Sequence, residues 1–373
     1  MVVKSNNIAI HHSLRGVAAL LVVFYHMKDI SHDKGASIDL ATSFFSRGYI
    51  WVDLFFILSG FILSFVYIKS MTYTPHKMEK TKEFLISRFA RIYPLHITTL
   101  LLLLCINILS HYIFSSNDIF SERMSPESLA TNILLVHSWG FHETHTWNIP
   151  SWSVSTEVFA YLLFPILLHI FSKRIALSNT VYLTISIAFY IFIFYNYGSI
   201  EGGSGTHISR CIAGFLLGMT IFNIYNKLGT GSIILINSMQ AICTLGILFS
   251  LHFGFHDALI VLLFALLIYF TSDNKGILLP IMSSRPLAYM GSLSYSIYLI
   301  HWLVYELYWL YGKFVFSGIA STYSPINVTI LKYTIFFLLT IALSFLSYKF
   351  IEIPTQRYIK LSYSKHRSKS KSN

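Results

Sequence analysis

The chain has 373 residues, of which 54% are hydrophobic and only 12% are charged. Soluble globular domains carry about 25% charged residues, so this composition excludes an ordinary soluble protein and indicates an integral membrane protein. A net charge of +11 is also typical of nucleic-acid-binding proteins, but the basic residues are placed as membrane topology requires. We therefore predict an all-α, polytopic protein that contacts membrane lipids and binds no nucleic acid.

Ten apolar segments approach the ~20 residues that a spanning helix needs. Their ranges are 13–31, 48–68, 86–110, 152–172, 176–196, 206–226, 232–251, 254–272, 287–310 and 330–351. An even number of spans places both termini on one side. With both termini in the cytoplasm, 20 of the 27 Lys and Arg residues lie on the cytoplasmic side, which the positive-inside rule favours. A shorter apolar segment, 128–138, is a candidate re-entrant segment.

Residues 1–355 are expected to form one transmembrane domain, and 356–373 a basic, disordered cytoplasmic tail attracted to anionic lipid. The cysteines lie in apolar segments without metal-ligand spacing, which predicts buried packing residues: Cys105, Cys211 and Cys243. The histidines of the loop before the fourth span also lack matched ligands, so no metal is expected at His137, His142 and His145.

The first span contains Arg15 and, eleven residues later, His26. Eleven residues at ~100° each return to nearly the same helix face and separate the two by about 16 Å along the axis. Ionisable groups in a membrane helix are costly and are usually functional. With Arg15 at the cytoplasmic edge, His26 is expected midway across a hydrocarbon core roughly 30 Å thick. The structural alternatives are an interface anchor for Arg15 and an interhelical hydrogen bond for His26.

Two arginines, Arg88 and Arg91, lie in RFARIYP at the cytoplasmic entrance of the third span. A spacing of three places both guanidinium groups on one helix face. Planar cations at a membrane edge suit bidentate binding of phosphate. Anchoring by the positive-inside rule is the alternative, although lysine would serve that role equally well.

Two carboxylates lie inside predicted spans. Glu157, in WNIPSWSVSTEVFAYLLFP, falls one to two turns inside the outer end of the fourth span. A carboxylate there should be paired, and a His–Glu pair would orient an imidazole for general-base catalysis. Asp53, near the outer end of the second span, is either a site residue or a paired structural one.

The remaining candidates are polar or aromatic groups that could contact a substrate. Trp152 and Ser153 belong to the same motif as Glu157, and an interfacial belt is the alternative for the tryptophan. Tyr295 and His301 lie in GSLSYSIYLIH, a polar run inside an apolar span. That run predicts either a substrate passage or a satisfied interhelical network.

Five motifs, in this order, resemble the membrane-bound acyltransferase family 3, which contains bacterial polysaccharide O-acetyltransferases. They are LRGVAALLVVFYH at 14–26, WVDLFFILSGFIL at 51–63, RFARIYP at 88–94, WNIPSWSVSTEVFAYLLFP at 147–165 and GSLSYSIYLIH at 291–301. By position, Arg15 and His26 match the family's first-helix pair, Arg88 and Arg91 its Arg-x-x-Arg motif, and Glu157 the acidic residue after the Trp-Ser motif.

The resemblance implies transfer of an acetyl group from cytoplasmic acetyl-CoA to a sugar hydroxyl on the far side of the bacterial inner membrane. The acceptor would be a polysaccharide or lipid-linked saccharide, as in O-antigen, capsule or exopolysaccharide. Arg88, Arg91 and Arg15 would hold the phosphates of the donor. His26, oriented by Glu157 or Asp53, would act as the base, with a covalent acyl-enzyme as the alternative route.

A different class of protein also fits ten spans with buried charges. A non-enzymatic transporter of a lipid-linked sugar or an acyl donor would carry the same features. Transporters often show internal repeats with broken helices in corresponding positions, and the sequence shows no such repeats. The enzyme is therefore the favoured hypothesis.

Overall fold

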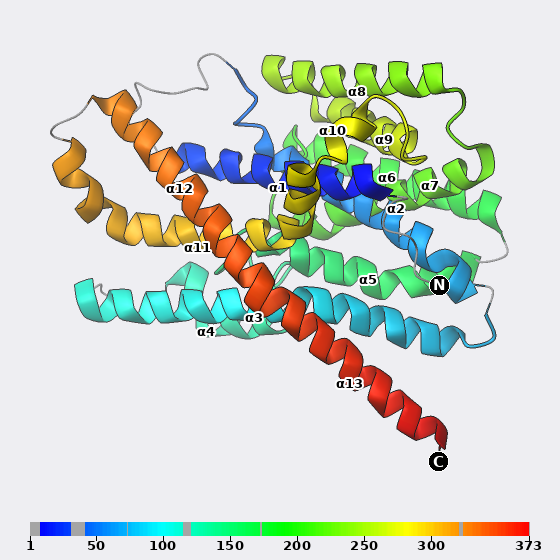
Figure 1. Cartoon of the computed structure of the whole chain (residues 1–373), viewed down its shortest axis with the longest axis horizontal. Helices are drawn as coiled ribbons and strands as arrows, with labels where there is room; N and C mark the ends of the chain where they lie inside the picture. The colour runs from blue at the N-terminus through cyan, green and yellow to red at the C-terminus, as the bar shows by residue number, and fades with distance from the viewer. Residues whose placement is uncertain are drawn as a thin grey trace. The chain divides into compact units, whose positions relative to one another are not determined.

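The computed structural model describes residues 8–30, 42–72, 74–114, 121–171, 174–320 and 324–372. These residues form helices and connecting turns and contain no strand, which confirms the all-α prediction (Figure 1). The α-helices are α1 (Ala9–Met27), α2 (Trp51–Thr72), α3 (Lys77–Phe114), α4 (Pro126–Ile133), α5 (Ser151–Phe171), α6 (Ile175–Tyr197), α7 (His207–Leu228), α8 (Ile233–Phe253), α9 (Asp257–Thr271), α10 (Leu278–Met282), α11 (Arg285–Ala320), α12 (Pro325–Ser347) and α13 (Ile353–Ser372).

Each of the ten predicted spans overlaps one of these helices. Within the described residues, seven helices are long and apolar enough to cross a membrane: α2, α3, α5, α6, α7, α8 and α12. The other three are α9, which has only 15 residues, and the helices α1 and α11, which contain polar side chains among their apolar ones and fall outside that set. The count of ten crossings and the cytoplasmic termini stay predictions.

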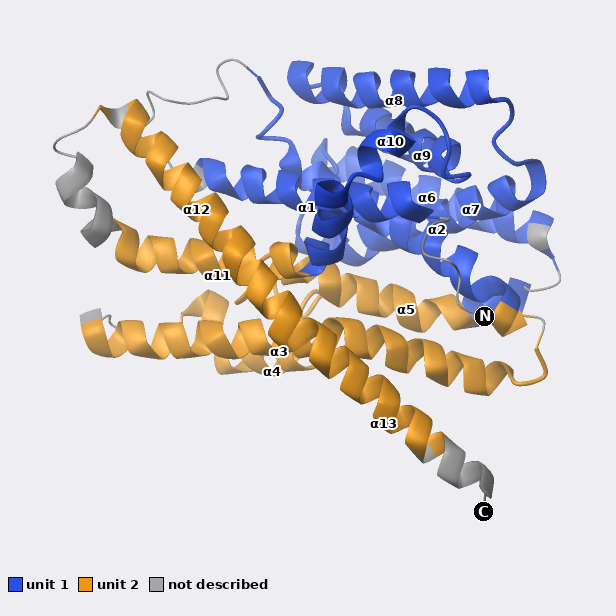
Figure 2. Cartoon of the chain, viewed as in Figure 1, with its two compact units in different colours: residues 1–69, 166–295 blue, residues 70–165, 296–373 orange. Residues whose placement is uncertain are grey.

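The chain divides into two compact units, residues 1–69 with 166–295 and residues 70–165 with 296–373 (Figure 2). In the first unit, polar contacts gather at both ends of the helices. At one end, the Tyr25 hydroxyl donates to Glu201 (2.9 Å). At the same end, the Asp257 carboxylate accepts hydrogen bonds from Arg47 (3.1 Å) and from the Ile200 amide (2.9 Å).

The opposite ends of α1, α7 and α9 meet through a second set of contacts. The Ile10 amide donates to Asn274 (3.1 Å), and the Tyr225 hydroxyl donates to Asp273 (2.9 Å). Because α1 and α9 each run from the first set to the second, both helices extend through the unit, although α9 has only 15 residues. The loops that the predicted topology assigns to the same side of the membrane therefore lie at the same end of this unit.

Glycines allow α2 and α7 to cross at backbone contact within the first unit. A Cβ built on Gly60 would lie 2.0 Å from the Phe215 carbonyl oxygen, and one built on Gly218 would lie 2.0 Å from the Ile57 carbonyl oxygen. No side chain fits either place. Small residues at a helix crossing are typical of packing inside membranes, where dispersion contacts replace the hydrophobic effect.

In the second unit, the eight residues of α4 are too few to span a bilayer. The chain then turns irregularly until α5 begins at Ser151. Buried hydrogen bonds hold this turn: Trp147 Nε1 donates to Ser128 Oγ (2.9 Å), and Asn132 Nδ2 donates to Thr146 Oγ1 (2.8 Å). The shortness of α4 agrees with the expectation that 128–138 does not cross the membrane.

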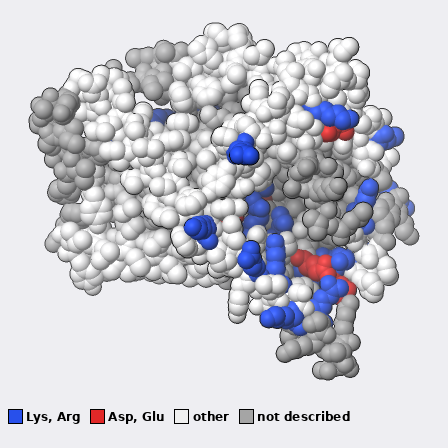
Figure 3. All heavy atoms as spheres, viewed as in Figure 1, with Lys and Arg blue, Asp and Glu red and all other residues white. Residues whose placement is uncertain are grey.

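The basic C-terminal segment was expected to be disordered, but the structure places 353–372 in the helix α13. Arg367 Nε lies 2.5 Å from Glu79 Oε1, and the same guanidinium pairs with Glu83, both on α3. Figure 3 shows basic and acidic side chains gathered over α13 and the first turns of α3. Composition could not predict this helix, because its partners lie almost 300 residues earlier in the chain.

The cysteine expectation holds for two of the three residues. Cys211 and Cys243 are buried, but Cys105 is exposed on α3. A residue in an apolar membrane segment can be shielded from water by protein or by lipid. The composition of the segment therefore does not predict whether such a residue is buried in the protein.

Candidate functional site

Arg15 and His26 lie on α1, and both are half-buried. Because α1 begins at Ala9 and ends at Met27, Arg15 lies two turns inside the helix and His26 lies in its last turn. The predicted span, 13–31, was shifted toward the C-terminus. His26 was predicted near the midpoint of the span, but it lies near the C-terminal end of α1. It is therefore close to the polar contacts at that end of the unit.

His26 has an aromatic and ionic neighbourhood built by the first unit. The Tyr25 ring meets the His26 ring edge to face at 4.8 Å, and the Tyr49 ring lies 6.1 Å from that of Tyr25. The Lys28 ammonium lies 4.4 Å from the centre of the Tyr25 ring, within the range of a cation–π contact. Glu201 completes the group by accepting the Tyr25 hydroxyl hydrogen. Sequence reasoning did not select Tyr25, Lys28 or Glu201.

Asp53 is fully buried on α2 and pairs with Arg210 of α7, which is equally buried. Arg210 Nη2 lies 2.7 Å from Asp53 Oδ2, and Nε lies 3.3 Å from Oδ1. Arg210 also donates to the Tyr49 carbonyl oxygen at 2.9 Å. These contacts favour the structural alternative for Asp53, and its role in orienting His26 stays a prediction. An arginine inside an apolar span was the signal that could have identified Arg210.

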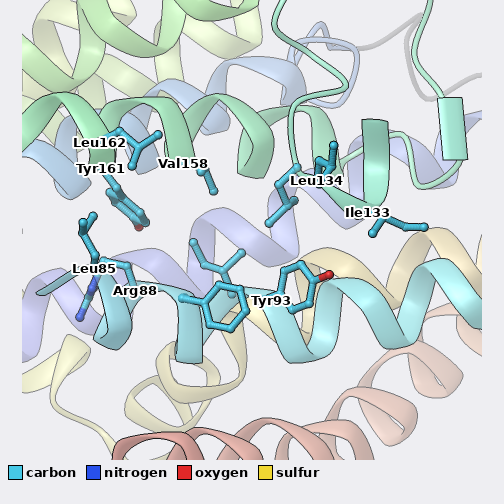
Figure 4. A pocket seen from close by; sticks show the side chains of 11 residues that line it. Leu85, Arg88, Tyr93, Ile133, Leu134, Val158, Tyr161 and Leu162 are labelled. Atoms are coloured by element: carbon cyan, nitrogen blue, oxygen red, sulfur yellow. The ribbon is translucent and has the colours of Figure 1, made fainter. Parts of the chain in front are cut away.

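Arg88 lies at one end of a cavity of about 470 Å³ in the second unit. Side chains of α3 and α5 and the end of α4 line the cavity, and Arg88 is its single charged lining residue (Figure 4). Phe89, Tyr93, Tyr161 and aliphatic side chains form the rest of the wall. The cavity volume falls within the range of roughly 300–1,000 Å³ that small-molecule sites occupy. Arg91 lies one turn further along α3 and is not among the lining residues.

Glu157 is half-buried on α5, immediately before Val158, which lines this cavity. Tyr161, one turn later on the same face, also lines it. The carboxylate is thus held on the helix that forms one wall of the cavity. Its pairing with His26 stays a prediction.

The Trp-Ser motif and the polar run of α11 meet inside the second unit. Ser153 Oγ lies 2.7 Å from the Tyr298 hydroxyl, and the Tyr298 ring meets His301 edge to face at 6.1 Å. Trp152 packs against His145 with ring centres 6.1 Å apart. Two predicted substrate residues, Ser153 and His301, therefore share one neighbour. Tyr295 is buried in the other unit.

His137 lies in the turn after α4 and contacts Ser151, the first residue of α5. The Ser151 hydroxyl donates to the Asn148 carbonyl oxygen (2.6 Å), so His137 Nε2, at 3.1 Å, must donate to Ser151 Oγ. Burial, with neighbouring His96, lowers the pKa of His137 well below its ordinary range. Because Nε2 is the donor in this hydrogen bond, His137 is not placed to accept the Ser151 proton as a general base.

The three loop histidines contact different partners. His142 lies 2.7 Å from Thr131 Oγ1, His145 packs on Trp152, and His137 contacts Ser151. Across the part of the chain that the structure describes, no three His, Cys, Asp or Glu side chains converge as metal ligands would.

Apolar spanning helices with buried ionisable groups define this chain as a polytopic membrane protein with a polar site within its helices. Residues 12–349 match the family model described as an acyltransferase domain, so the chain belongs to that acyltransferase family.

Several characterised proteins are similar to this chain. It is 25% identical to "O-acetyltransferase OatA" of Staphylococcus aureus over 92% of this chain and 56% of that protein. It is 33% identical to "Acyltransferase MdmB" of Streptomyces mycarofaciens over 41% of this chain and 37% of that protein. The chain thus spans between a third and three fifths of the length of these relatives. No solved structure matches it.

Proposed function

We propose that this protein is an integral-membrane O-acyltransferase that moves an acetyl group from cytoplasmic acetyl-CoA to a hydroxyl of a surface polysaccharide or a lipid-linked saccharide. The observation that carries the proposal is His26, a half-buried imidazole in the last turn of α1, in a chain of the acyltransferase family. The bacterial inner membrane is the proposed location, with the acceptor on its outer face.

The donor would use the cavity beside Arg88. A guanidinium suits the phosphates of the donor, and the cavity behind it has an apolar wall suited to a thin acyl-carrying arm. Arg91 and Arg15 would add positive charge near the cytoplasmic mouth. The relatives named as O-acetyltransferases support acetyl as the transferred group.

His26 would take the proton of the acceptor hydroxyl while the hydroxyl oxygen attacks the thioester carbonyl. The tetrahedral intermediate then collapses, the C–S bond breaks, and the departing thiolate takes the proton back from His26, which restores the neutral imidazole. The products are an O-acetyl ester and free CoA. A positioned base of this kind contributes about 10²–10⁴-fold in rate, and Glu157 would support the charged imidazole.

The test compares ester content of the surface glycan, by NMR, in cells that carry the wild type or single variants. His26→Ala and Glu157→Gln should lower acetylation by at least 100-fold and 10-fold, respectively. His76→Ala, an exposed residue between α2 and α3, is the matched control and should leave acetylation unchanged. Normal acetylation by a folded His26→Ala protein would overturn the catalytic assignment.

Donor binding is measured separately on purified protein with acetyl-CoA. Arg88→Ala should weaken binding by about tenfold to a hundredfold, because a charge-assisted hydrogen bond contributes roughly 1.5–3 kcal/mol. His26→Ala should bind the donor normally. Unchanged affinity in Arg88→Ala and in Arg91→Ala would contradict the phosphate role.

A further inference from the structure

Glu201, a carboxylate linked to His26 through Tyr25, has no role in the proposed binding of acetyl-CoA. Glu201 is exposed in the turn between α6 and α7, and its Oε1 accepts the Tyr25 hydroxyl hydrogen at 2.9 Å. Tyr25 precedes His26 in the chain, and the two rings meet at 4.8 Å. Glu201 is therefore linked to the proposed base by a single side chain.

The turn that carries Glu201 is fixed rather than loosely attached. The amide of Ile200, the residue before it, donates to Asp257 at 2.9 Å. The same carboxylate pairs with Arg47 at 3.1 Å and accepts the Tyr49 hydroxyl hydrogen at 3.1 Å. On the other side, Thr206 Oγ1 donates to the Gly203 carbonyl oxygen at 2.7 Å. Although 198–206 is rich in glycine, its backbone is pre-organised beside α1.

The group has the chemistry that recognises a sugar. A carboxylate offers about four lone-pair positions, and among the described residues Tyr25 is the one side chain that donates to Glu201, so positions remain for hydroxyl donors. The half-buried Tyr49 ring supplies apolar surface, whereas the Lys28 ammonium lies over one face of the Tyr25 ring. A bond from a hydroxyl to an ionised acceptor is shorter and about twice as strong as one between neutral groups.

We propose that Glu201, held by Tyr25, is the acceptor subsite and binds hydroxyl groups of the saccharide next to the one that is acylated. This assignment rests on the proposed function, because it takes His26 as the base. Under the predicted topology the turn lies on the outer face, where the acceptor would arrive. Glu201 would position the acceptor and would not take part in the proton transfer.

The test uses the full-length protein in lipid nanodiscs. The probe is the surface glycan of the same cells, stripped of its esters by mild alkali. Its binding is measured without donor, and initial rates are then measured against glycan and against acetyl-CoA. The variants are Glu201→Gln and Tyr25→Phe. Matched controls are Glu122→Gln and Tyr195→Phe, which alter exposed side chains elsewhere.

Glu201→Gln should weaken glycan binding and raise the glycan KM about tenfold, as expected for loss of a hydrogen bond to a charged group. Tyr25→Phe should act in the same direction but less strongly, because it frees the carboxylate without removing it. In both variants the KM for acetyl-CoA and the melting temperature should stay at wild-type values. A purely structural link would instead lower the melting temperature or change both KM values together.

Glycan binding that is equal in the wild type and in Glu201→Gln overturns the subsite, whether or not the protein transfers acetyl groups. Glycan binding that depends on Glu201 in a wild type without transfer activity overturns the proposed reaction and leaves the subsite standing. The two outcomes are distinguished because binding is measured without turnover.

Discussion

At the scale of single residues, the buried pair of Asp53 and Arg210 makes a stability prediction. Removing one partner leaves an unpaired charge in an apolar interior, which costs about 3–5 kcal/mol. Arg210→Met should therefore lower the melting temperature in detergent strongly. The double variant Asp53→Leu, Arg210→Met should recover much of the loss, because no buried charge remains.

The matched control is the half-exposed pair of Lys80 and Glu83, whose charged atoms lie 2.8 Å apart. Lys80→Met should cost at most about 1 kcal/mol, as surface pairs generally do. A small loss in Arg210→Met, comparable with that of Lys80→Met, would contradict the view that this pair is an essential part of the packing of α2 against α7.

His137 predicts a pH dependence of stability. Its folded pKa is lowered by burial, whereas the unfolded side chain keeps its ordinary value of 6.5. As pH falls through 6.5, the unfolded state binds a proton that the folded state does not, so stability falls. Comparing melting temperatures at pH 7.5 and 5.5 should show a smaller drop in His137→Gln than in the wild type.

His76→Gln, which alters an exposed histidine, provides the comparison for this pH effect and should keep the wild-type drop. An identical drop in His137→Gln and in the wild type would show that other groups govern the acid sensitivity. The sequence placed His137 in the loop before the fourth span, and only the packing of His96 and Ser151 around it reveals its burial.

At the scale of elements, the crossing of α2 and α7 depends on Gly60 and Gly218. A leucine at Gly218 would place its Cβ 2.0 Å from the Ile57 carbonyl oxygen, so the helices would have to separate. Gly218→Leu should abolish the folded protein, seen as loss of a monodisperse peak in gel filtration. Gly205→Ala, at a glycine with open space around it, should fold normally. A monodisperse Gly218→Leu protein would contradict the close crossing.

Helix positions were predicted well because hydropathy alone identifies a membrane segment. Their boundaries were not, and α1 shows why this matters. The predicted span began at 13, whereas the helix begins at Ala9 because Ile10 and His11 bond to Asn274, Ile268 and Thr271 of distant segments. These tertiary hydrogen bonds keep polar residues within the helix, at positions where the hydropathy pattern predicts that the span has not yet begun.

At the scale of the whole molecule, the topology predicts which loops water-soluble reagents reach. In a background without native cysteines, Gly205→Cys should react with a membrane-impermeant maleimide in intact cells. Lys275→Cys should react only after the membrane is opened. The reverse pattern would invert the predicted orientation, and labelling of both in intact cells would contradict the alternation of spans.

The sequence by itself determined the class of protein, the helices, the family and the candidates His26, Arg88 and Glu157, because hydropathy and short motifs are local properties. Tertiary structure decided that Asp53 is paired with Arg210, that Arg88 borders a cavity that Arg91 does not line, and that Glu201 lies next to Tyr25. These partners are far apart in sequence, up to 176 residues for Glu201 and Tyr25. A buried or hydrogen-bonded charge is defined by what surrounds it, and folding alone brings those surroundings together.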